Sequence, residues 1–163
     1  FDFPPGFLSR LGNDDLRNVE IIKRLEQECE RGSQILFFAC SVEHSLFISS
    51  LLQYLGRSSV HIDGSTDKEF RRQALNNFKA KTVQVLCNYG ILSTGFDAPQ
   101  TDVVFISRPT NSIVLYSQMI GRGLRGPAIG GTPTCKLIDV RDNITGFSND
   151  DAVYTYFDGY WTN

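Results

Sequence analysis

The sequence predicts an α/β fold: an open parallel sheet of about five or six strands with helices on both faces. Two observations lead to this prediction. First, short runs such as residues 35–40 are apolar at every position, as in strands that are buried on both faces. Second, these runs alternate with longer segments whose apolar residues recur at helical spacing. Such alternation implies parallel strands joined by right-handed crossovers, with helices covering the sheet.

The expected strands are the short apolar runs themselves. They cover residues 35–40, 60–62, 83–87, 103–106 and 135–140. The first expected helix covers residues 14–31 and should face the core with Leu16, Val19, Ile22, Leu25 and Cys29. The second begins after Ser41, a residue type that caps helices, and ends at Gly56. Its apolar stripe should consist of Leu46, Phe47, Leu51, Leu52 and Leu55.

Two further helices are expected. Thr66 and Glu69 have the spacing of a capping box, in which each side chain accepts from the other residue's backbone. The helix behind this box should bury Phe70, Ala74, Leu75 and Phe78. A fourth helix is expected from Thr110 or Asn111 through Met119.

The composition is that of one ordinary globular domain. The chain has 163 residues, of which 41% are apolar and 21% charged. Its net charge of −2 does not by itself indicate nucleic acid, so any such contact must be local or shared with another domain. No apolar run approaches the roughly 20 residues that span a bilayer. The chain has no signal peptide and no initiator Met, and we interpret it as part of a longer, cytoplasmic protein.

The cysteines and histidines predict no metal site. None of the four cysteines forms a CxxC pair, and three lie in apolar runs, where Cys behaves as a small core residue. This pattern fits a reduced compartment. His44 and His61 are isolated in the sequence, without metal-ligand spacing.

The chain divides into a main domain, residues 1–145, with a helical lead-in at about 14–31, and a C-terminal extension, residues 146–163. The extension has too many aromatic residues for a solvated tail, and we expect it to pack on this domain or on a neighbour. These residues are Tyr154, Tyr156, Phe157, Tyr160 and Trp161.

Ligands of an open parallel sheet bind beyond the carboxyl ends of its strands, and the polar loops of this chain follow those ends. Arg122 and Arg125 lie three residues apart, so on a helical turn they point to one side. Two guanidinium groups aimed together suit an anion such as a triphosphate. From spacing alone, a solvated basic helix end is an equally good interpretation.

The motifs taken together favour the triphosphate. Segment 118–125 resembles the QxxGRxxR motif VI of superfamily 2 helicases and translocases, and segment 94–99 resembles their motif V. Segment 38–41 resembles motif IV, and segment 61–66 resembles the region between motifs IV and V. Their order and spacing agree over roughly residues 30–140. The stretch 108–118 is most similar to the branch with restriction-enzyme motor subunits and DNA-repair-type DEXH helicases.

The resemblance implies the second, C-terminal RecA-like domain of a helicase. Arg122 and Arg125 would be arginine fingers that reach ATP on the first domain and stabilise transition-state charge. Gln118 would position them or the attacking water. Asp97, beside Gly95 in the ATP-binding set, would contact the ribose or couple the nucleotide to the arginines; a simple turn Asp before Ala98-Pro99 is the alternative.

The resemblance also implies a nucleic-acid track. Small hydroxyls and backbone N–H groups would hold phosphates without reading bases. For Ser41 a helix cap, and for Gly64 a tight turn, are equally good interpretations. Arg71 would contact the backbone or lie solvated on its helix. The residues assigned to this track are Ser41, Gly64, Asn88, Thr94, Gly95 and Arg71.

The sequence lacks the other half of an ATPase. It contains no GxxxxGK[ST] loop, and no strand ends in Asp-Glu. In the resembling family both lie on the first RecA-like domain, so that domain would be the partner and would hold most ligands of ATP and Mg²⁺. The isolated chain should be inactive. Nucleic acid, DNA rather than RNA, would be the other partner, and no membrane is expected.

Two rival functions stay open at this point. A degenerate helicase fold could serve as a scaffold or interaction module without ATPase activity, although Gln118, Arg122 and Arg125 are intact. An unrelated nucleotide enzyme would need a glycine-rich loop after the first strand, and segment 40–43 contains no glycine.

Overall fold

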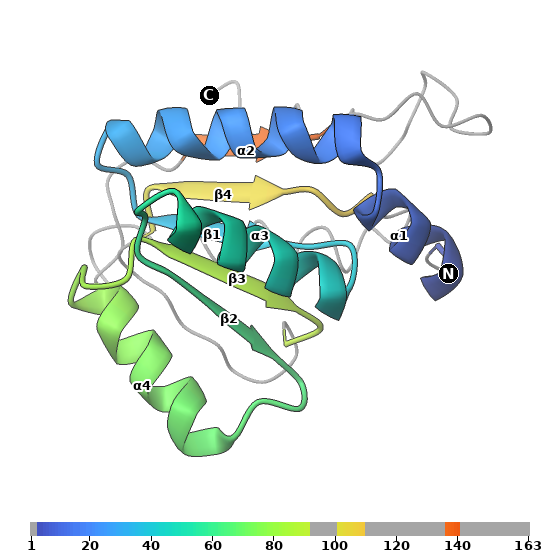
Figure 1. The fold of residues 1–163 in the computed structure, drawn as a ribbon. Helices are drawn as coiled ribbons and strands as arrows, with labels where there is room; N and C mark the ends of the chain where they lie inside the picture. The colour runs from blue at the N-terminus through green and yellow to red at the C-terminus, as the bar shows by residue number, and fades with distance from the viewer. Residues whose placement is uncertain (1–2, 92–100, 110–135, 141–163) are drawn as a thin grey trace, which may run out of the picture.

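The computed structural model describes residues 3–91, 101–109 and 136–140. These residues form an all-parallel sheet of five strands in the order β2-β3-β1-β4-β5 (Figure 1). The predicted fold class is therefore confirmed. The strands are β1 (Ile35–Phe38), β2 (Ser59–Asp63), β3 (Val85–Tyr89), β4 (Val103–Ile106) and β5 (Lys136–Asp139).

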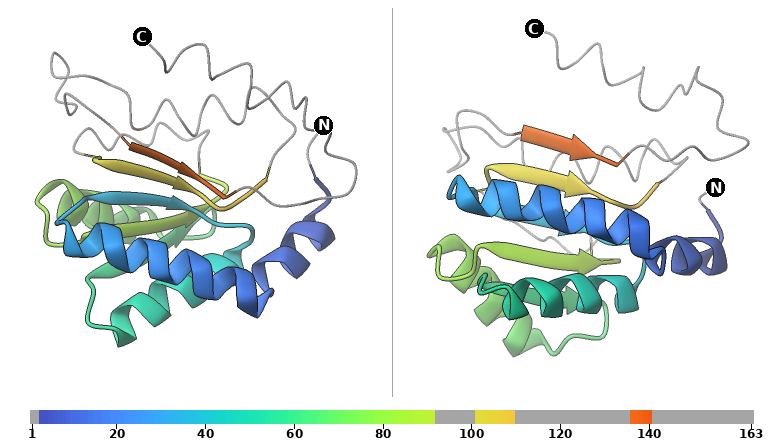
Figure 2. Two further views of the ribbon diagram at one scale, coloured as in Figure 1. Left: turned by 90° about the horizontal axis from the view of Figure 1, so that it is seen from above. Right: turned by 45° about the horizontal axis from the view of Figure 1, so that its top comes forward.

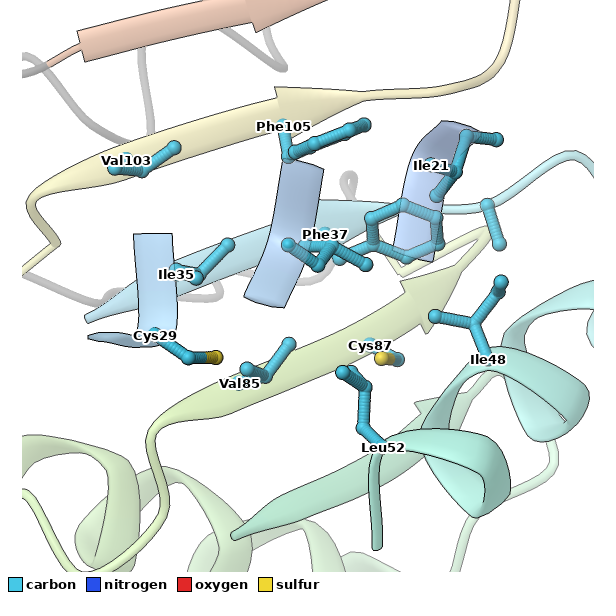
Figure 3. Close-up of a cluster of buried hydrophobic side chains, with 12 residues drawn as sticks. Ile21, Cys29, Ile35, Phe37, Ile48, Leu52, Val85, Cys87, Val103 and Phe105 are labelled. Atoms are coloured by element: carbon cyan, nitrogen blue, oxygen red, sulfur yellow. The ribbon is translucent and has the colours of Figure 1, made fainter. Parts of the chain in front are cut away.

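Helices cover both faces of the sheet (Figure 2). On one face, α2 (Asp15–Glu30) and α3 (Val42–Tyr54) pack on alternate strand residues such as Phe37 and Phe105. Figure 3 shows this cluster, in which Ile21 of α2 and Leu52 of α3 meet the sheet. On the other face, α4 (Lys68–Lys79) buries Ala74 and Phe78 against Leu36, Ile62 and Leu86.

Strand β3 begins two residues later than predicted. The backbone N–H of Val83 donates to the carbonyl of Asn77 in the turn that follows α4, at 3.2 Å. The carbonyl of Val83 accepts from Nε2 of Gln34 at 2.9 Å. The backbone of Val83 is thus engaged outside the sheet, and the strand begins only at Val85.

The core-facing side of α2 differs from the prediction. Leu25 and Cys29 are buried as expected, but Leu16 is 83% and Val19 50% exposed. Two polar residues, Asn18 and Glu28, are buried instead. Each has strong partners: Asn18 binds His44 and the Gly12 carbonyl, and Glu28 binds Arg31 and Lys136 at 2.9 Å each. Their burial rotates the helix away from its apolar stripe.

The stripe predicted for α3 is also mostly wrong. Ser41 caps the helix and Gly56, at φ +85°, follows its end, both as predicted. However, Leu46, Phe47 and Leu55 are 44–48% exposed, and of the predicted stripe only Leu52 is fully buried. The reason is that the inner face carries serines that bond to β2: Ser49 to Ser59 at 3.0 Å, and Ser45 to His61 at 2.6 Å.

Asp67, not Thr66, caps α4. The Asp67 carboxylate accepts from the backbone N–H groups of Glu69 and Phe70. Thr66 is occupied elsewhere, because its Oγ1 accepts from the Asp63 backbone N–H at 2.8 Å. Ala74 and Phe78 are buried as predicted, whereas Phe70 is 48% exposed.

A helix that the sequence did not predict precedes α2. Helix α1 (Pro5–Gly12) begins with Pro at its first turn, buries Leu8 and contacts α3. Its last residue lies close to His44: a Cβ added at Gly12 would be 2.9 Å from the His44 Cβ. No helix in the described part of the chain is long and apolar enough to cross a membrane.

Cys29, Cys40 and Cys87 are buried, as predicted for core residues. Burial raises the pKa of the Cys29 thiol to about 11 and that of Cys87 to about 12, so both stay protonated at neutral pH. Cys135 lies outside the described residues.

Two alanine substitutions in α1 should have opposite effects. Gly12→Ala places a methyl group against the His44 ring and should destabilise the fold by about 1–3 kcal/mol. Gly6→Ala meets no atom within 4 Å and should stabilise the helix by up to about 0.5 kcal/mol. Urea unfolding of both variants measures the difference. Equal stability would contradict the close packing of α1 on α3.

Candidate nucleotide and nucleic-acid interface

The carboxyl ends of all five strands lie along one edge of the sheet, because the strands are parallel (Figure 1). Helices α3 and α4 each begin there, directly after β1 and β2. The positive dipole end of α3 favours anions at this carboxyl edge, whereas in α4 the Asp67 carboxylate already accepts from the first N–H groups. Four residues of the predicted track lie at it in the described part of the chain: Ser41, Gly64, Arg71 and Asn88.

Ser41 caps α3. Its Oγ accepts from the His44 backbone N–H at 3.0 Å, and the residue is 9% exposed. The preceding N–H, that of Cys40, donates to Nδ1 of His44 at 3.0 Å. The hydroxyl hydrogen of Ser41 takes part in none of the hydrogen bonds described for these residues. Ser41 can therefore cap the helix and still donate to an anion at the edge.

His44 is the centre of a buried hydrogen-bond chain. Because its Nδ1 accepts from Cys40, its proton is on Nε2, which donates to Oδ1 of Asn18 at 2.8 Å. Nδ2 of Asn18 donates in turn to the Gly12 carbonyl at 2.8 Å. Burial, aided by the charge of Arg17, lowers the pKa of His44 to about 4. The neutral ring thus joins the α1–α2 corner to the loop after β1.

Arg17 joins the ends of two adjacent strands. Its guanidinium donates to the Ser107 carbonyl after β4 and to Sγ of Cys40 after β1. The Cys40 thiol donates to the same carbonyl at 3.3 Å, and the Ser107 hydroxyl to the Phe38 carbonyl at 2.7 Å. Sequence reasoning missed Arg17, Asn18 and this role of His44. The partners lie 23 to 90 residues apart, and no local pattern indicates them.

The loop after β2 is built around the Asp63 carboxylate. Oδ1 accepts from the Ser65 N–H at 2.7 Å and from its hydroxyl at 2.6 Å, while Oδ2 is 2.6 Å from Nε2 of His61. Burial alone would raise the pKa of Asp63, but the bonds from Ser65 and His61 outweigh it and lower the pKa. The carboxylate therefore stays ionised and fixes the loop that contains Gly64.

The fold itself does not require glycine at position 64. The residue is exposed, does not have a left-handed φ, and would place a Cβ in open space. Gly64 does lie in a tight turn, the alternative interpretation from sequence, in which the Thr66 N–H donates to the Asp63 carbonyl at 3.1 Å. The backbone of this turn does not, however, need a glycine. Arg71 lies beside the loop, where its Nη2 is 3.4 Å from the Asp63 carbonyl. The Arg71 Nε is buried and has no hydrogen-bond partner among the described residues.

Asn88 differs from the other three. It is 1% exposed, and its Nδ2 donates to the Phe37 carbonyl at 2.9 Å. Its side chain joins β3 to β1 and does not reach a surface in this conformation. The next residue, Tyr89, is only half-buried. Its ring lies 5.2 Å from the guanidinium of Arg108, which follows β4.

The comparisons with known proteins agree with this arrangement. The family model described as "Helicase conserved C-terminal domain" matches residues 17–126, about two thirds of the chain. This chain belongs to the helicase C-terminal domain family. The match covers the carboxyl ends of β1 to β4 and extends through the segment with Gln118, Arg122 and Arg125.

The chain is also similar in sequence to named proteins. The chain is 36% identical over 123 residues to the "51.5 kDa protein" of Lactococcus phage (isolate 7-9), covering 74% of this chain and 27% of the phage protein. It is 34% identical over 125 residues to the putative mitochondrial ATP-dependent helicase irc3 of Schizosaccharomyces pombe, covering 77% of this chain and 20% of irc3. The chain thus spans less than a third of these relatives.

Among solved structures, domain 2 of the DEAD-box helicase Mss116p, bound to an RNA duplex, superposes with a TM-score of 0.62 at 20% identity. The match covers 80% of this chain and 50% of the Mss116p chain. At this identity the likeness supports the fold alone, which is the RecA-like α/β fold of helicase domains.

The other predicted site residues of this helicase domain lie outside the described residues. They are Thr94, Gly95, Asp97, Gln118, Arg122 and Arg125. The fourth predicted helix, from 110 or 111 to 119, and the extension 146–163 also lie outside them. Among the residues that are described, no group of three His, Cys, Asp or Glu side chains could hold a metal ion.

The pH dependence of stability tests the buried hydrogen bonds of His44. Unfolded His44 takes up a proton below about pH 6.5, but the folded residue does so only near pH 4. The unfolded state therefore binds more protons between these values, and stability falls as the pH is lowered through this window, by at most about 1.4 kcal/mol per pH unit. His44→Gln should be less stable at pH 7 but should show a flatter profile.

Urea unfolding between pH 7 and pH 5 measures this slope. The window stays above the ordinary pKa values of aspartate and glutamate side chains, 3.8 and 4.5, and the folded state lowers the pKa of Asp63 and that of Glu28 further. Parallel profiles for wild type and His44→Gln would show that His44 is not the buried neutral group described above.

Proposed function

We propose that this chain is the second motor domain of an ATP-dependent nucleic-acid helicase or translocase. It would supply arginine fingers to an ATP site and form part of a nucleic-acid track. The observation that supports this most is the match to the family, which spans in one alignment both the carboxyl edge and the segment with the two arginines. ATP dependence is part of the name of irc3, a relative of this chain.

The ATP half of the proposal concerns segments 94–97 and 118–125. Arg122 and Arg125 would reach the phosphates of ATP bound on the first RecA-like domain, with Gln118 positioning them or the attacking water. Asp97 and Gly95 would contact the nucleotide from the motif V loop. ATP and Mg²⁺ would have their main ligands on that first domain.

The nucleic-acid half concerns the edge formed by β1 and β2. The Ser41 hydroxyl and the bare backbone at Gly64 offer contacts to phosphates, and Arg71 adds a charge beside Gly64. Thr94 would extend this track. We omit the buried Asn88 side chain from this track. Such contacts hold the backbone of a strand without reading its bases.

DNA is the proposed polymer, on the resemblance of segment 108–118 to DNA-repair-type helicases and restriction motor subunits. The Mss116p domain was solved with an RNA duplex, so RNA is the alternative that an experiment must separate. A degenerate scaffold without ATPase activity is the second candidate function. The intact Gln118, Arg122 and Arg125 oppose it, because a scaffold would not need them.

ATP turnover by the full-length protein tests the motor function. Wild type should hydrolyse ATP faster with single-stranded DNA than with RNA or without nucleic acid. Arg125→Ala should lower the rate by about 10³-fold or more, the range typical of an arginine finger. The isolated 163-residue chain should hydrolyse none. Normal turnover by the variant would exclude the finger, and no turnover with any polymer would favour the scaffold.

Neighbouring arginines on α4 test the track. Arg71 lies beside the Gly64 loop, whereas Arg72 is exposed and paired with Glu69. Arg71→Ala should weaken DNA binding by the full-length protein at all sequences and reduce the slope of log K against log salt by about 1. Arg72→Ala, the matched control, should have a smaller effect on both the DNA affinity and the salt slope. Equal effects of the two would remove Arg71 from the track.

Gly64→Ala is a second test of the same loop. The fold tolerates the methyl group, because no atom lies within 4 Å of it. If a phosphate approaches this backbone, the variant should lose about tenfold in affinity for DNA, equivalent to ~1.4 kcal/mol, with unchanged thermal stability. Unchanged affinity in a fluorescence anisotropy titration would show that no DNA phosphate lies close to the backbone of this loop.

A further inference from the structure

Helix α3 is apolar on its outer side as well as on its inner side. Ile48 and Leu52 face the core, while Leu46, Phe47 and Tyr54 point outward and are 46%, 48% and 87% exposed. Leu55, at the end of the helix, is 44% exposed. Single apolar residues are common on surfaces, but several exposed apolar residues along one helix can mark a contact surface. The outer side of α3 is therefore a candidate contact surface.

Exposed apolar residues also lie on α2. Leu16 and Val19, in the first turns of α2, are 83% and 50% exposed. Helices α2 and α3 contact each other on the same face of the sheet, and both begin at the carboxyl edge (Figure 2). We call the outer face the set of Leu16, Val19, Leu46, Phe47, Tyr54 and Leu55.

The chain leaves the described sheet beside this outer face. Strand β5 ends at Asp139, at the same carboxyl edge where α2 begins. Ile138 and Val140 pack on the cluster that α2 covers, as Ile22 of α2 does. The residues that follow β5 thus start next to the exposed first turns of α2.

The chain that follows has the composition to cover an apolar surface. Residues 146–163 contain Tyr154, Tyr156, Phe157, Tyr160 and Trp161, and no Lys or Arg. About 14 residues separate β5 from the first of these aromatics, enough to extend roughly 46 Å. A globular domain of this length has a radius of gyration of about 15 Å, so the segment can reach the whole outer face.

We propose that residues 146–163 pack, through their aromatic side chains, on the outer face of α2 and α3 of their own chain. The short tether makes this occupant more effective than a second copy, because it holds the segment at roughly millimolar effective concentration. The aromatic rings provide large apolar areas, and their hydroxyl and indole N–H groups stay at the rim of the contact.

The fluorescence of Trp161 tests this proposal, since it is the single tryptophan of the chain. The 163-residue chain should show a blue-shifted emission that is protected from acrylamide. Phe47→Ser should weaken docking by about tenfold or more, the loss expected for one buried phenyl group, with a red shift and stronger quenching. Phe70→Ser is the matched control: Phe70 is also 48% exposed but lies on α4, on the opposite face of the sheet.

Tyr54→Ser is a second variant that separates loss of docking from unfolding of the domain. Tyr54 is 87% exposed, so its replacement should leave the fold and its circular dichroism unchanged while shifting Trp161 emission as Phe47→Ser does. A solvent-like Trp161 in the wild-type chain would overturn the proposal. So would equal effects of Phe47→Ser and Phe70→Ser. A blue shift that disappears on dilution would assign the outer face to a second copy instead.

Discussion

The hydrogen-bond chain that runs from the Gly12 carbonyl through Asn18 and His44 to the Cys40 N–H holds the carboxyl edge of this domain in place. Each bond is buried and short, between 2.8 and 3.0 Å. A buried polar group without a partner costs about 1–3 kcal/mol, so losing any member of the chain leaves its neighbours unpaired. These hydrogen bonds also determine the tautomer of His44, and the bond to Cys40 fixes the loop that carries Ser41.

A second set of bonds completes this edge. Arg17 and Cys40 both donate to the Ser107 carbonyl, which ties the end of β1 to the end of β4. On the other side, Asp63 organises the loop after β2, and Asn88 joins β3 to β1. The edge is thus preorganised by side chains that do not themselves reach a ligand. Three of the residues that the resemblance assigns to the track, Ser41, Gly64 and Arg71, lie at this edge. Under the proposed function, these residues would hold the phosphates of a nucleic acid and not its bases.

The sequence predicted the sheet well because apolar runs identify buried strands directly. Strand β4 agrees residue for residue, and β1, β2 and β5 lie within or around the predicted bounds. The orientations of α2 and α3 were not predictable from apolar spacing, since Asn18, Glu28, Ser45 and Ser49 are buried by partners distant in the sequence. The cap of α4 was misplaced by one residue because Thr66 and Asp67 are both good capping residues, and only the Asp63 loop decides between them. Motif resemblance identified Ser41, Gly64 and Arg71 at the edge, but it could not show that Asn88 points inward.

A structure of the full-length protein with single-stranded DNA and a non-hydrolysable ATP analogue would test the central claim most directly. The proposed function predicts that Arg122 and Arg125 approach the terminal phosphate of the nucleotide on the first domain. It also predicts that DNA phosphates lie within hydrogen-bond distance of Ser41 and of the Gly64 backbone. Nucleic acid bound away from the carboxyl edge, or arginines turned away from the nucleotide, would contradict the assignment of this domain as a motor.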